Sequence, residues 1–232
     1  MLRKIKKKYS KNSRKKRGEL FVRTLSLQKT DCLLDLGGGN GSYIYEILAN
    51  EEIGNVTISD ISESDLSYAE QKFGYKTSLL DEGKKLPFSD NEFDIIFCNS
   101  VIEHVTLPKK DIWSFKSTKA FKELSLKRQG EFANEIRRIG KSYFVQTPYK
   151  YFIIESHSWL PGIIAILPRN IQISLIRFFN KFWMKKTSPD WNLLTFKDMQ
   201  QLFPEAQIYR EKSLGLTKSL VAIKAKASSN IR

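Results

Sequence analysis

The chain has 232 residues, 41% of them hydrophobic and 28% charged, a composition typical of one soluble globular domain with a substantial core. Two cysteines, Cys32 and Cys98, exclude a disulfide framework, and both lie in apolar runs, so we expect free buried thiols in a reducing compartment. Apolar runs fall short of the roughly eighteen residues of a membrane-spanning helix, and the N-terminus lacks the apolar segment of a secretory signal. We therefore predict a cytoplasmic protein.

The positive charge is concentrated at the N-terminus. Residues 1–18 contain ten Lys or Arg and no acid, and subtracting these ten charges from the net +14 leaves +4 for residues 19–232. Such a run predicts a disordered, solvated tail, with residues 19–232 forming the domain. Alternatively, the tail would attract a nucleic acid or an anionic lipid surface, which would make the protein peripheral at the inner face of a membrane.

After the tail, apolar runs of strand length alternate with segments of helical length. This pattern predicts an α/β fold, a doubly wound, mostly parallel sheet with helices on both faces. Seven strands are predicted, at 31–36, 55–60, 76–80, 93–98, 141–146, 206–211 and 219–225. Helices are predicted at 42–50, 64–73, 131–139 and 195–202, the last with Thr195 as its N-cap. The stretch 109–128 stays open, and residues 151–190, rich in aromatics and prolines, are predicted to be an insertion or lid after the fifth strand.

A glycine-rich segment follows the first predicted strand, reading Asp35-Leu36-Gly37-Gly38-Gly39-Asn40-Gly41. Glycine permits a sharp turn there and leaves the backbone N–H groups at the start of the next helix open to a ligand. The dinucleotide-binding spacing G-x-G-x-x-G would need glycine at position 42, where Ser42 stands. The carboxylate of Asp35 would also repel a pyrophosphate, whereas it suits a cationic ligand.

The pattern Asp35-x-Gly37-x-Gly39-x-Gly41 resembles the first motif of class I methyltransferases that use S-adenosylmethionine (SAM). Within that class, the sequence is similar to methyltransferases of type 11. The resemblance implies a Rossmann-like fold and SAM as the methyl donor. In that family the loop holds the methionine and ribose of SAM, and the strand carboxylate orients the loop. The resemblance therefore implies a donor site formed by Asp35, Gly37, Gly39, Asn40 and Gly41.

Further acids support a nucleoside site. Asp60 closes the second predicted strand, where it could accept hydrogen bonds from both ribose hydroxyls or merely cap the following helix. Ile61 could then pack on the adenine. The stretch from Leu80 through Leu86-Pro87-Phe88 to Asp94 resembles the family's adenine-binding segment, with Asp81 as the candidate contact and Glu82 as its alternative. Asn99, at the end of the fourth strand, completes the predicted donor site.

The acceptor side offers two histidines. Methyl transfer from a sulfonium has an excellent leaving group, so we expect no metal, but a hydroxyl acceptor needs a base. His104 stands in a Glu-His-Val segment that the family places beside the transfer point, although it could simply be a packing residue. His157 follows the fifth strand, and Glu155 could orient it as a base; a loop histidine bonded to backbone is the alternative.

The segments after the fifth strand and at residues 202–206 and 215–219 resemble a bacterial subgroup often associated with surface-polysaccharide biosynthesis. This favours O-methylation of a small molecule, a glycan precursor or a lipid-linked sugar. An RNA methyltransferase that uses the basic tail is the alternative, although Asn99-Ser100-Val101 lacks the Pro-Pro-aromatic motif of enzymes that methylate base amines. A second alternative is a non-catalytic scaffold subunit that binds SAM.

Residues 170–185 have helical periodicity, with one polar stripe and a wide apolar face that includes Ile171, Phe178 and Phe182. That face would pack on the domain, or it would lie in a membrane interface with the basic residues at the headgroups.

Overall fold

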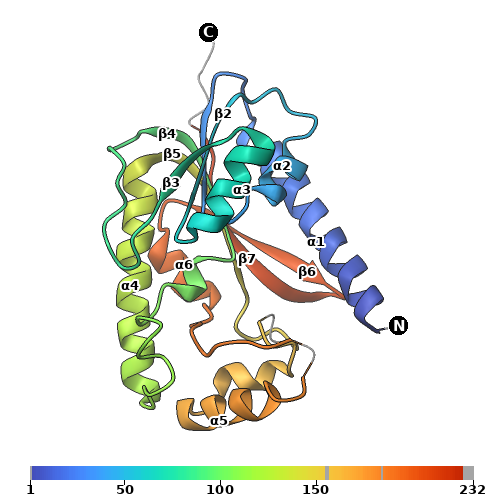
Figure 1. Cartoon of the computed structure of the whole chain (residues 1–232), viewed down its shortest axis with the longest axis vertical. Coiled ribbons are helices and arrows are strands. Elements are labelled where there is room, and N and C mark those ends of the chain that lie inside the picture. The colour runs from blue at the N-terminus through green and yellow to red at the C-terminus, as the bar shows by residue number, and fades with distance from the viewer. Residues whose placement is uncertain (1, 155–156, 184, 227–232) are drawn as a thin grey trace.

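The computed structural model describes residues 2–154, 157–183 and 185–226. Its centre is a seven-stranded sheet in the order β3-β2-β1-β4-β5-β7-β6 (Figure 1). The strands are β1 (Cys32–Leu36), β2 (Asn55–Asp60), β3 (Lys76–Leu79), β4 (Phe93–Asn99), β5 (Gly140–Pro148), β6 (Gln207–Ser213) and β7 (Leu216–Lys224). All seven predicted strands are confirmed, with ends that move by a few residues.

The sheet is mixed. Strands β1 to β5 pair in parallel, β7 runs antiparallel to β5, and β6 pairs antiparallel with β7 as an edge hairpin. The carboxyl ends of the parallel strands therefore meet at one edge, where α/β sheets bind their ligands. The order reverses beside β1, so the loops after β1 and β4 flank the crevice in which a ligand is expected.

Helices cover both faces, as predicted. They are α1 (Leu2–Leu25), α2 (Ser42–Ile47), α3 (Glu63–Phe73), α4 (Thr118–Ile139), α5 (Arg169–Phe179) and α6 (Phe196–Leu202), with short 3₁₀ turns η1 (Ile102–His104) and η2 (Gly162–Ile166). A capping box at Thr195 and Asp198 starts α6. Helix α4 begins at Thr118, after the N-cap Ser117 and well before the predicted start at 131. The prediction missed its first half because polar Ser125 and Gln129 lie on the buried face and interrupt the apolar stripe.

The sheet separates two hydrophobic clusters. On one face, Leu34, Ile96 and Tyr143 pack with Ile136 of α4 and Met199 of α6. On the other face lie Leu33, Phe97 and Phe144 with side chains of α1, α2 and α3, such as Phe21, Ile44 and Leu66. Consecutive strand residues thus serve opposite clusters, as the two-residue period of a strand requires.

Helix α1 replaces the disordered tail predicted over residues 1–18. Its C-terminal part belongs to the core: Leu20, Phe21 and Leu25 are buried, and the Phe21 ring lies 4.7 Å from Phe97 and 5.4 Å from Phe144 between centroids. Tertiary packing of this end starts a helix that Lys and Arg, good helix formers, can extend toward the N-terminus. The prediction used charge alone and therefore missed it.

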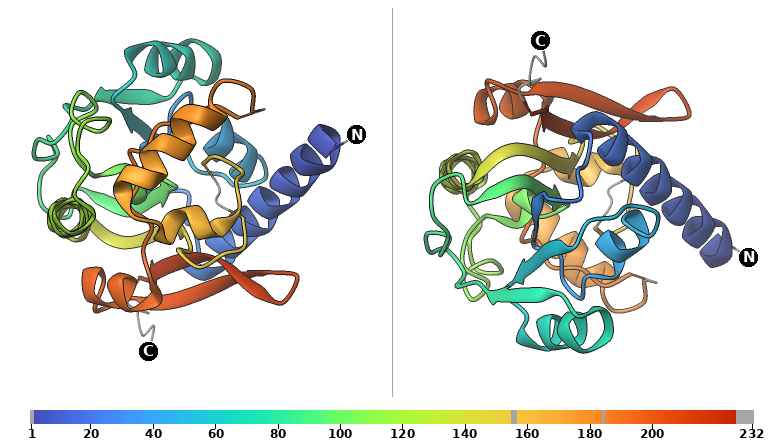
Figure 2. Two further views of the ribbon diagram at one scale, coloured as in Figure 1. Left: turned by 90° about the horizontal axis from the view of Figure 1, so that it is seen from below. Right: turned by 90° about the horizontal axis from the view of Figure 1, so that it is seen from above.

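The described parts of residues 151–190, here called the cap, lie beyond the carboxyl ends of the strands and not on a face of the sheet (Figures 1 and 2). They hold η2 and α5 and share a small cluster of Leu160, Ile164 and Ile176 with Trp191 and Leu193. Helix α5 ends at Phe179, earlier than the periodicity of residues 170–185 indicates. None of the described helices is long and apolar enough to cross a lipid bilayer.

Replacing Phe21 with alanine tests whether α1 is part of the core. Because Phe21 is fully buried between two rings, we expect Phe21→Ala to lower the free energy of unfolding by about 3–5 kcal/mol in urea denaturation. Phe182→Ala, at a side chain that is 61% exposed, is the matched control and should cost less than about 0.5 kcal/mol. Equal effects of the two variants would contradict the packing of α1.

Candidate active site

The loop between β1 and α2 turns through left-handed backbone conformations. Gly37, Gly39 and Gly41 have φ of +73°, +53° and +71°, a region that favours glycine. A Cβ on Gly37 would lie 2.4 Å from Cγ2 of Val101, so the loop also approaches the end of β4 more closely than any side chain would allow. The Gly37 N–H donates to the Ser59 carbonyl at 2.7 Å, which ties the turn to β2.

Asp35 is enclosed behind this loop. A Cβ on Gly38 would lie 2.4 Å from Oδ2 of Asp35, so the carboxyl group packs directly beneath the loop backbone. Burial, and secondly the negative charge of Asp60, raise the pKa of Asp35 to about 8. A ligand with positive charge above the loop would favour the ionised form, which agrees with the orienting role that Asp35 is predicted to have.

Asp60 holds the loop in place. Its Oδ2 accepts a hydrogen bond from the Gly39 N–H at 2.8 Å, and its Oδ1 accepts one from the Ser62 N–H at 3.0 Å. The acid therefore joins the glycine turn to the start of α3. Its predicted contact with ribose hydroxyls stays a prediction.

A pocket of about 370 Å³ lies over the glycine loop. Among the predicted residues, it brings together Asp35, Gly37, Gly39, Asn40 and Asn99. Ile61 is exposed beside Asp60, and Asp81 pairs with Lys84 at the surface, with Nζ–Oδ2 of 2.8 Å. Neither these residues nor Glu82 belong to the described lining, so their adenine contacts stay predictions.

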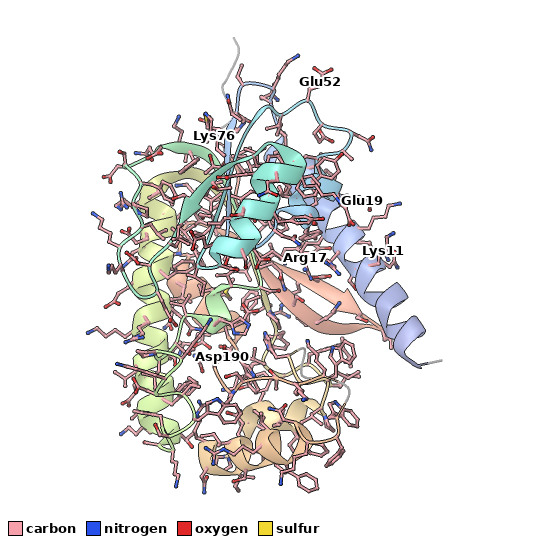
Figure 3. The ribbon with its side chains drawn as sticks, viewed as in Figure 1. Lys11, Arg17, Glu19, Glu52, Lys76 and Asp190 are labelled. Atoms are coloured by element: carbon pink, nitrogen blue, oxygen red, sulfur yellow. The ribbon has the colours of Figure 1, made fainter. Side chains whose placement is uncertain are left out.

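Two arginines of α1 were missed by the sequence analysis. Arg14 lines the pocket, and Arg17 donates from Nη1 to Oδ1 of Asn99 at 2.7 Å while its Nη2 pairs with Oε2 of Glu211, also at 2.7 Å. Figure 3 shows Arg17 between α1 and the sheet. Nothing in a run of ten basic residues distinguishes these two, so only the packing of α1 could identify them.

These residues fit SAM. The methionine end of that molecule carries an ammonium, a sulfonium and a carboxylate, and the pocket offers the buried acid Asp35 together with the cation Arg14. The loop backbone is not covered by side chains at Gly39, where an added Cβ would meet nothing within 4 Å. Opposite charges beside an uncovered loop backbone suit a ligand that carries both a positive and a negative charge.

A second pocket, of about 320 Å³, adjoins the first through Arg14 and Asn99. It extends from the ends of β4 and β5 to the cap. Its described lining contains five Lys or Arg and no acid, and its apolar side chains include Phe152, Trp159 and Leu193. This acceptor pocket, as we call it, combines positive charge with apolar walls.

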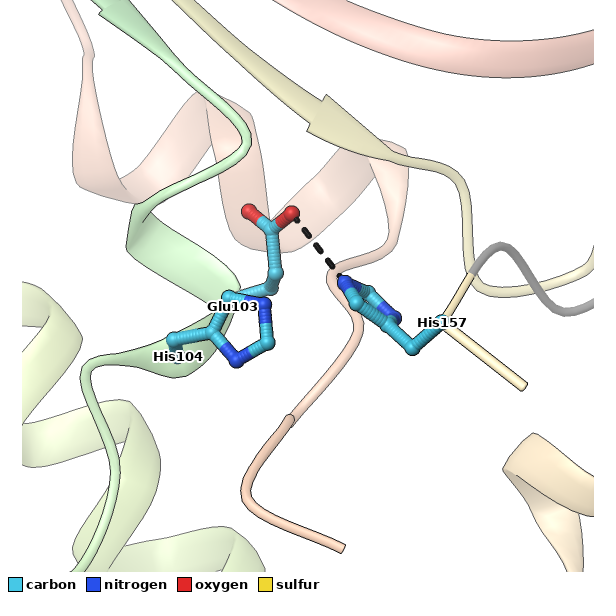
Figure 4. Close-up of side chains that lie close together, drawn as sticks. All are labelled: Glu103, His104 and His157. Atoms are coloured by element: carbon cyan, nitrogen blue, oxygen red, sulfur yellow. Dashed lines mark ion pairs between the residues drawn. The ribbon is translucent and has the colours of Figure 1, made fainter. Parts of the chain in front are cut away.

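The two histidines meet at the end of β4. Glu103 and His104 lie in η1, and His157 comes from the segment after β5; the ring centroids of the histidines are 4.6 Å apart (Figure 4). Nε2 of His157 is 3.5 Å from Oε1 of Glu103, which is fully buried. The sequence thus predicted the two histidines correctly as neighbours of this edge but not their carboxylate partner.

The predicted pairing of His157 with Glu155 lies outside the described residues, because Glu155 is not among them. Glu103 precedes His104 directly in the predicted Glu-His-Val segment. This position next to His104 could have indicated Glu103 as a carboxylate partner, but the sequence does not show which way its side chain points.

Substituting Gly37 should distort the pocket over the glycine loop, here called the donor pocket. Gly37→Ala adds a Cβ that collides with Val101 at a left-handed φ, and strain of about 1–3 kcal/mol should weaken SAM binding roughly tenfold or more in calorimetry. Gly215→Ala is the matched control, because Gly215 has φ of +79° in the β6–β7 turn with open space around it. Wild-type affinity in Gly37→Ala would contradict the assignment.

The raised pKa of Asp35 gives a second test. The unfolded chain releases this proton near pH 3.8 and the folded chain near 8, so the stability from Asp35 is full below pH 3.8 and is lost as pH rises to 8. In the wild type, the free energy of unfolding should fall by at most about 1.4 kcal/mol per pH unit from this cause, and Asp35→Asn should remove this pH dependence. Urea denaturation of the SAM-free protein from pH 5 to 9 measures it. Asp81→Asn, at an exposed acid, is the control, and parallel curves for Asp35→Asn and the wild type would refute the shift.

Comparisons with known proteins agree with this geometry. Residues 34–133, from β1 into α4, match the family model described as a methyltransferase domain. A sequence search of curated proteins finds no match.

Solved structures share the fold. A SAM-dependent methyltransferase from Clostridium acetobutylicum is 12% identical, with a TM-score of 0.55 over 93% of this chain and 92% of that one. The PH0226 protein from Pyrococcus horikoshii is 14% identical, with a TM-score of 0.51 over 88% and 85% of the two chains. The family match covers the glycine loop, Asp60 and Glu103-His104, and the fold places them at one sheet edge. Residues 34–133 thus match a methyltransferase domain, and the chain as a whole has the fold of a SAM-dependent methyltransferase.

Proposed function

We propose that the protein methylates a hydroxyl group of an anionic acceptor that also has an apolar part, such as a phosphate-bearing, lipid-linked sugar. The observation that carries this proposal is the acceptor pocket, in which basic and apolar side chains lie beside Asn99 at the edge of the donor pocket. A phosphate could pair with these basic side chains, whereas a neutral sugar has no charge for them to contact.

Two lysines of the acceptor pocket support an anionic ligand. Lys150 and Lys218 are both about half buried, and burial is the main cause that lowers the pKa of each. Lys122 also lowers the pKa of Lys150, and Asp198 opposes this. Glu211 opposes the lowering of the pKa of Lys218, to which Arg17 adds a smaller contribution. An anion bound here would replace the lost hydration of both ammonium groups, so its binding would be favourable.

The outside of the cap supports a lipid surface. Apolar side chains stand exposed on η2, α5 and the turn after it: Ile163, Ile166, Ile171, Phe178 and Phe182. The inner side of α5 buries Ile173 and Ile176 together with polar Arg169 and Gln172, so only part of its apolar surface packs against the rest of the chain. An exposed apolar patch of this kind suits insertion into a headgroup region, and the basic N-terminal half of α1 would add attraction to anionic lipid.

The chemistry requires little of the protein beyond alignment and removal of a proton. Bound SAM supplies a methyl group on a sulfonium. The acceptor oxygen forms a bond to that carbon and must lose its proton, since an ether oxygen cannot keep it. Asn99 and Ser100 line the acceptor pocket, and η1, with Glu103 and His104, follows them directly in the chain. We assign loss of the proton to the cluster that these two residues form with His157.

The alternative of an RNA substrate has less support. Arg14 and Arg17, which belong to the basic run, line the two pockets and are not available as a separate RNA-binding arm. A non-catalytic scaffold would have no use for the buried Glu103 beside two histidines.

The acceptor test uses labelled SAM with four substrates: a phosphate-bearing lipid-linked sugar in vesicles, a soluble sugar phosphate, a neutral glycoside and RNA. Label should enter the first, and weakly the second. Lys150→Gln and Lys218→Gln should each lower kcat/KM about tenfold or more, because each removes a charged hydrogen bond to the anion.

Lys127→Gln, at an exposed lysine of α4, is the control and should leave the rate unchanged. Equal labelling of the neutral glycoside would contradict the anionic acceptor, and label in RNA alone would replace the proposal with its alternative.

A further inference from the structure

The cluster at the end of β4 has the residue types and the spacing of a metal site. Glu103, His104 and His157 each offer one ligand atom, and these atoms all lie within 4.8 Å of one another. They come from two separate segments, η1 and the segment after β5, which the parallel pairing of β4 and β5 brings to one edge.

Glu103 directs a charged oxygen into this cluster. The residue is 0% exposed, and its Oε1 has no hydrogen-bond partner among the described residues, although it lies 3.5 Å from Nε2 of His157. Its other oxygen, Oε2, accepts a hydrogen bond from the Thr147 hydroxyl at 3.1 Å, which fixes the plane of the carboxylate. A buried carboxylate oxygen without a donor is costly, so a positive charge at this point would be strongly favoured.

His104 is oriented from behind by an acid. Its Nδ1 lies 3.4 Å from Oδ1 of Asp190, and its other ring nitrogen is on the side of Glu103 and His157 (Figure 4). Histidines that bind metals are commonly held in this way, with a carboxylate on the nitrogen away from the ion. On the far side of the cluster, the indole of Trp191 stacks on His157 with 16° between the ring planes.

The backbone around the cluster is also fixed. The Asn192 N–H donates to the Glu103 carbonyl at 2.8 Å. The buried Gln129 of α4 donates from Nε2 to the carbonyls of Ile102, at 2.9 Å, and of Asn192, at 3.0 Å. These bonds join η1 to the segment that carries Asp190 and Trp191, so ligand and supporting residues are held as one unit.

We propose that Glu103 Oε1, His104 Nε2 and His157 Nε2 bind a divalent first-row transition cation, of the kind Zn²⁺, Fe²⁺ or Mn²⁺. Two imidazoles with one carboxylate suit such ions, whereas Mg²⁺ and Ca²⁺ prefer oxygen ligands. Bond lengths of about 2.0–2.2 Å place such ligands roughly 3–3.5 Å apart, so the side chains need to close in slightly. His104 can do so because it is 37% exposed.

Three protein ligands leave coordination positions for another molecule. The acceptor hydroxyl would take one of them, a step that rests on the proposed function. The cation would lower the pKa of this hydroxyl; its O–H bond breaks, its proton passes to solvent, and the oxygen gains the methyl carbon as the sulfur–carbon bond breaks. This role replaces the expectation that methyl transfer here needs no metal.

Binding of Co²⁺ to the tag-free, full-length protein, stripped with EDTA, tests the site. We expect one Co²⁺ per chain, with visible absorption bands of a nitrogen- and oxygen-ligated ion, and competition by Zn²⁺ but not by Mg²⁺. His104→Ala and Glu103→Gln should abolish these bands. Asp190→Asn, which removes the supporting acid, should weaken binding about 10–100-fold.

Glu51→Gln combined with Glu52→Gln, at acids remote from the cluster, is the control and should bind Co²⁺ as the wild type does. SAM affinity and thermal unfolding show that each variant is folded. Absence of stoichiometric Co²⁺, or unchanged bands in His104→Ala, would overturn the site. Full methyltransferase activity of the stripped protein in EDTA would overturn the catalytic role of the cation while leaving the proposed function intact. Co²⁺ binding without label in any acceptor would support the metal site and count against the proposed function.

Discussion

Two carboxylates that contact a glycine turn, the buried Asp35 and the partly exposed Asp60, determine how this protein can bind its donor. Asp35 lies under the Gly38 backbone and Asp60 accepts from the Gly39 N–H, so the loop is held between them while its outer side faces the pocket. Burial of Asp35, and secondly the negative charge of Asp60, raise the pKa of Asp35 to about 8. A positive charge on a bound donor would attract both carboxylates and so offset the repulsion between them. The site therefore favours a cationic ligand over a neutral one.

Helix α1 makes this site dependent on the N-terminal segment. Arg17 bridges Asn99, at the end of β4, and Glu211, on the edge strand β6, while it lies almost completely buried. A buried arginine needs its partners, because an unpaired charge in the interior is costly. The same helix places Arg14 at the boundary of the donor and acceptor pockets. The basic run therefore contains at least two residues, Arg14 and Arg17, that belong to the site.

Local sequence periodicity was sufficient for the sheet, because each buried strand is a short apolar run bounded by turn residues. The glycine loop was predictable for the same reason: its geometry depends on backbone freedom that only glycine supplies. Side-chain partners were not predictable. Arg17 and Glu211 are 194 residues apart, and Glu103 reaches His157 only because β4 and β5 pair in register. Helix α1 and the first half of α4 were missed because their burial comes from tertiary packing, with polar Gln129 inside and basic residues beside apolar ones.

The burial of Glu103 bears on how the acceptor is activated. If an imidazole alone took the proton, the partner carboxylate would need only to orient it, and Asp190, which is 20% exposed, already does that for His104. Glu103 is instead fully enclosed, with one oxygen satisfied by Thr147 and the other directed at the space between the histidines. Enclosing a charge in this way costs free energy that orientation does not require, whereas a cation shared by all three side chains would recover it.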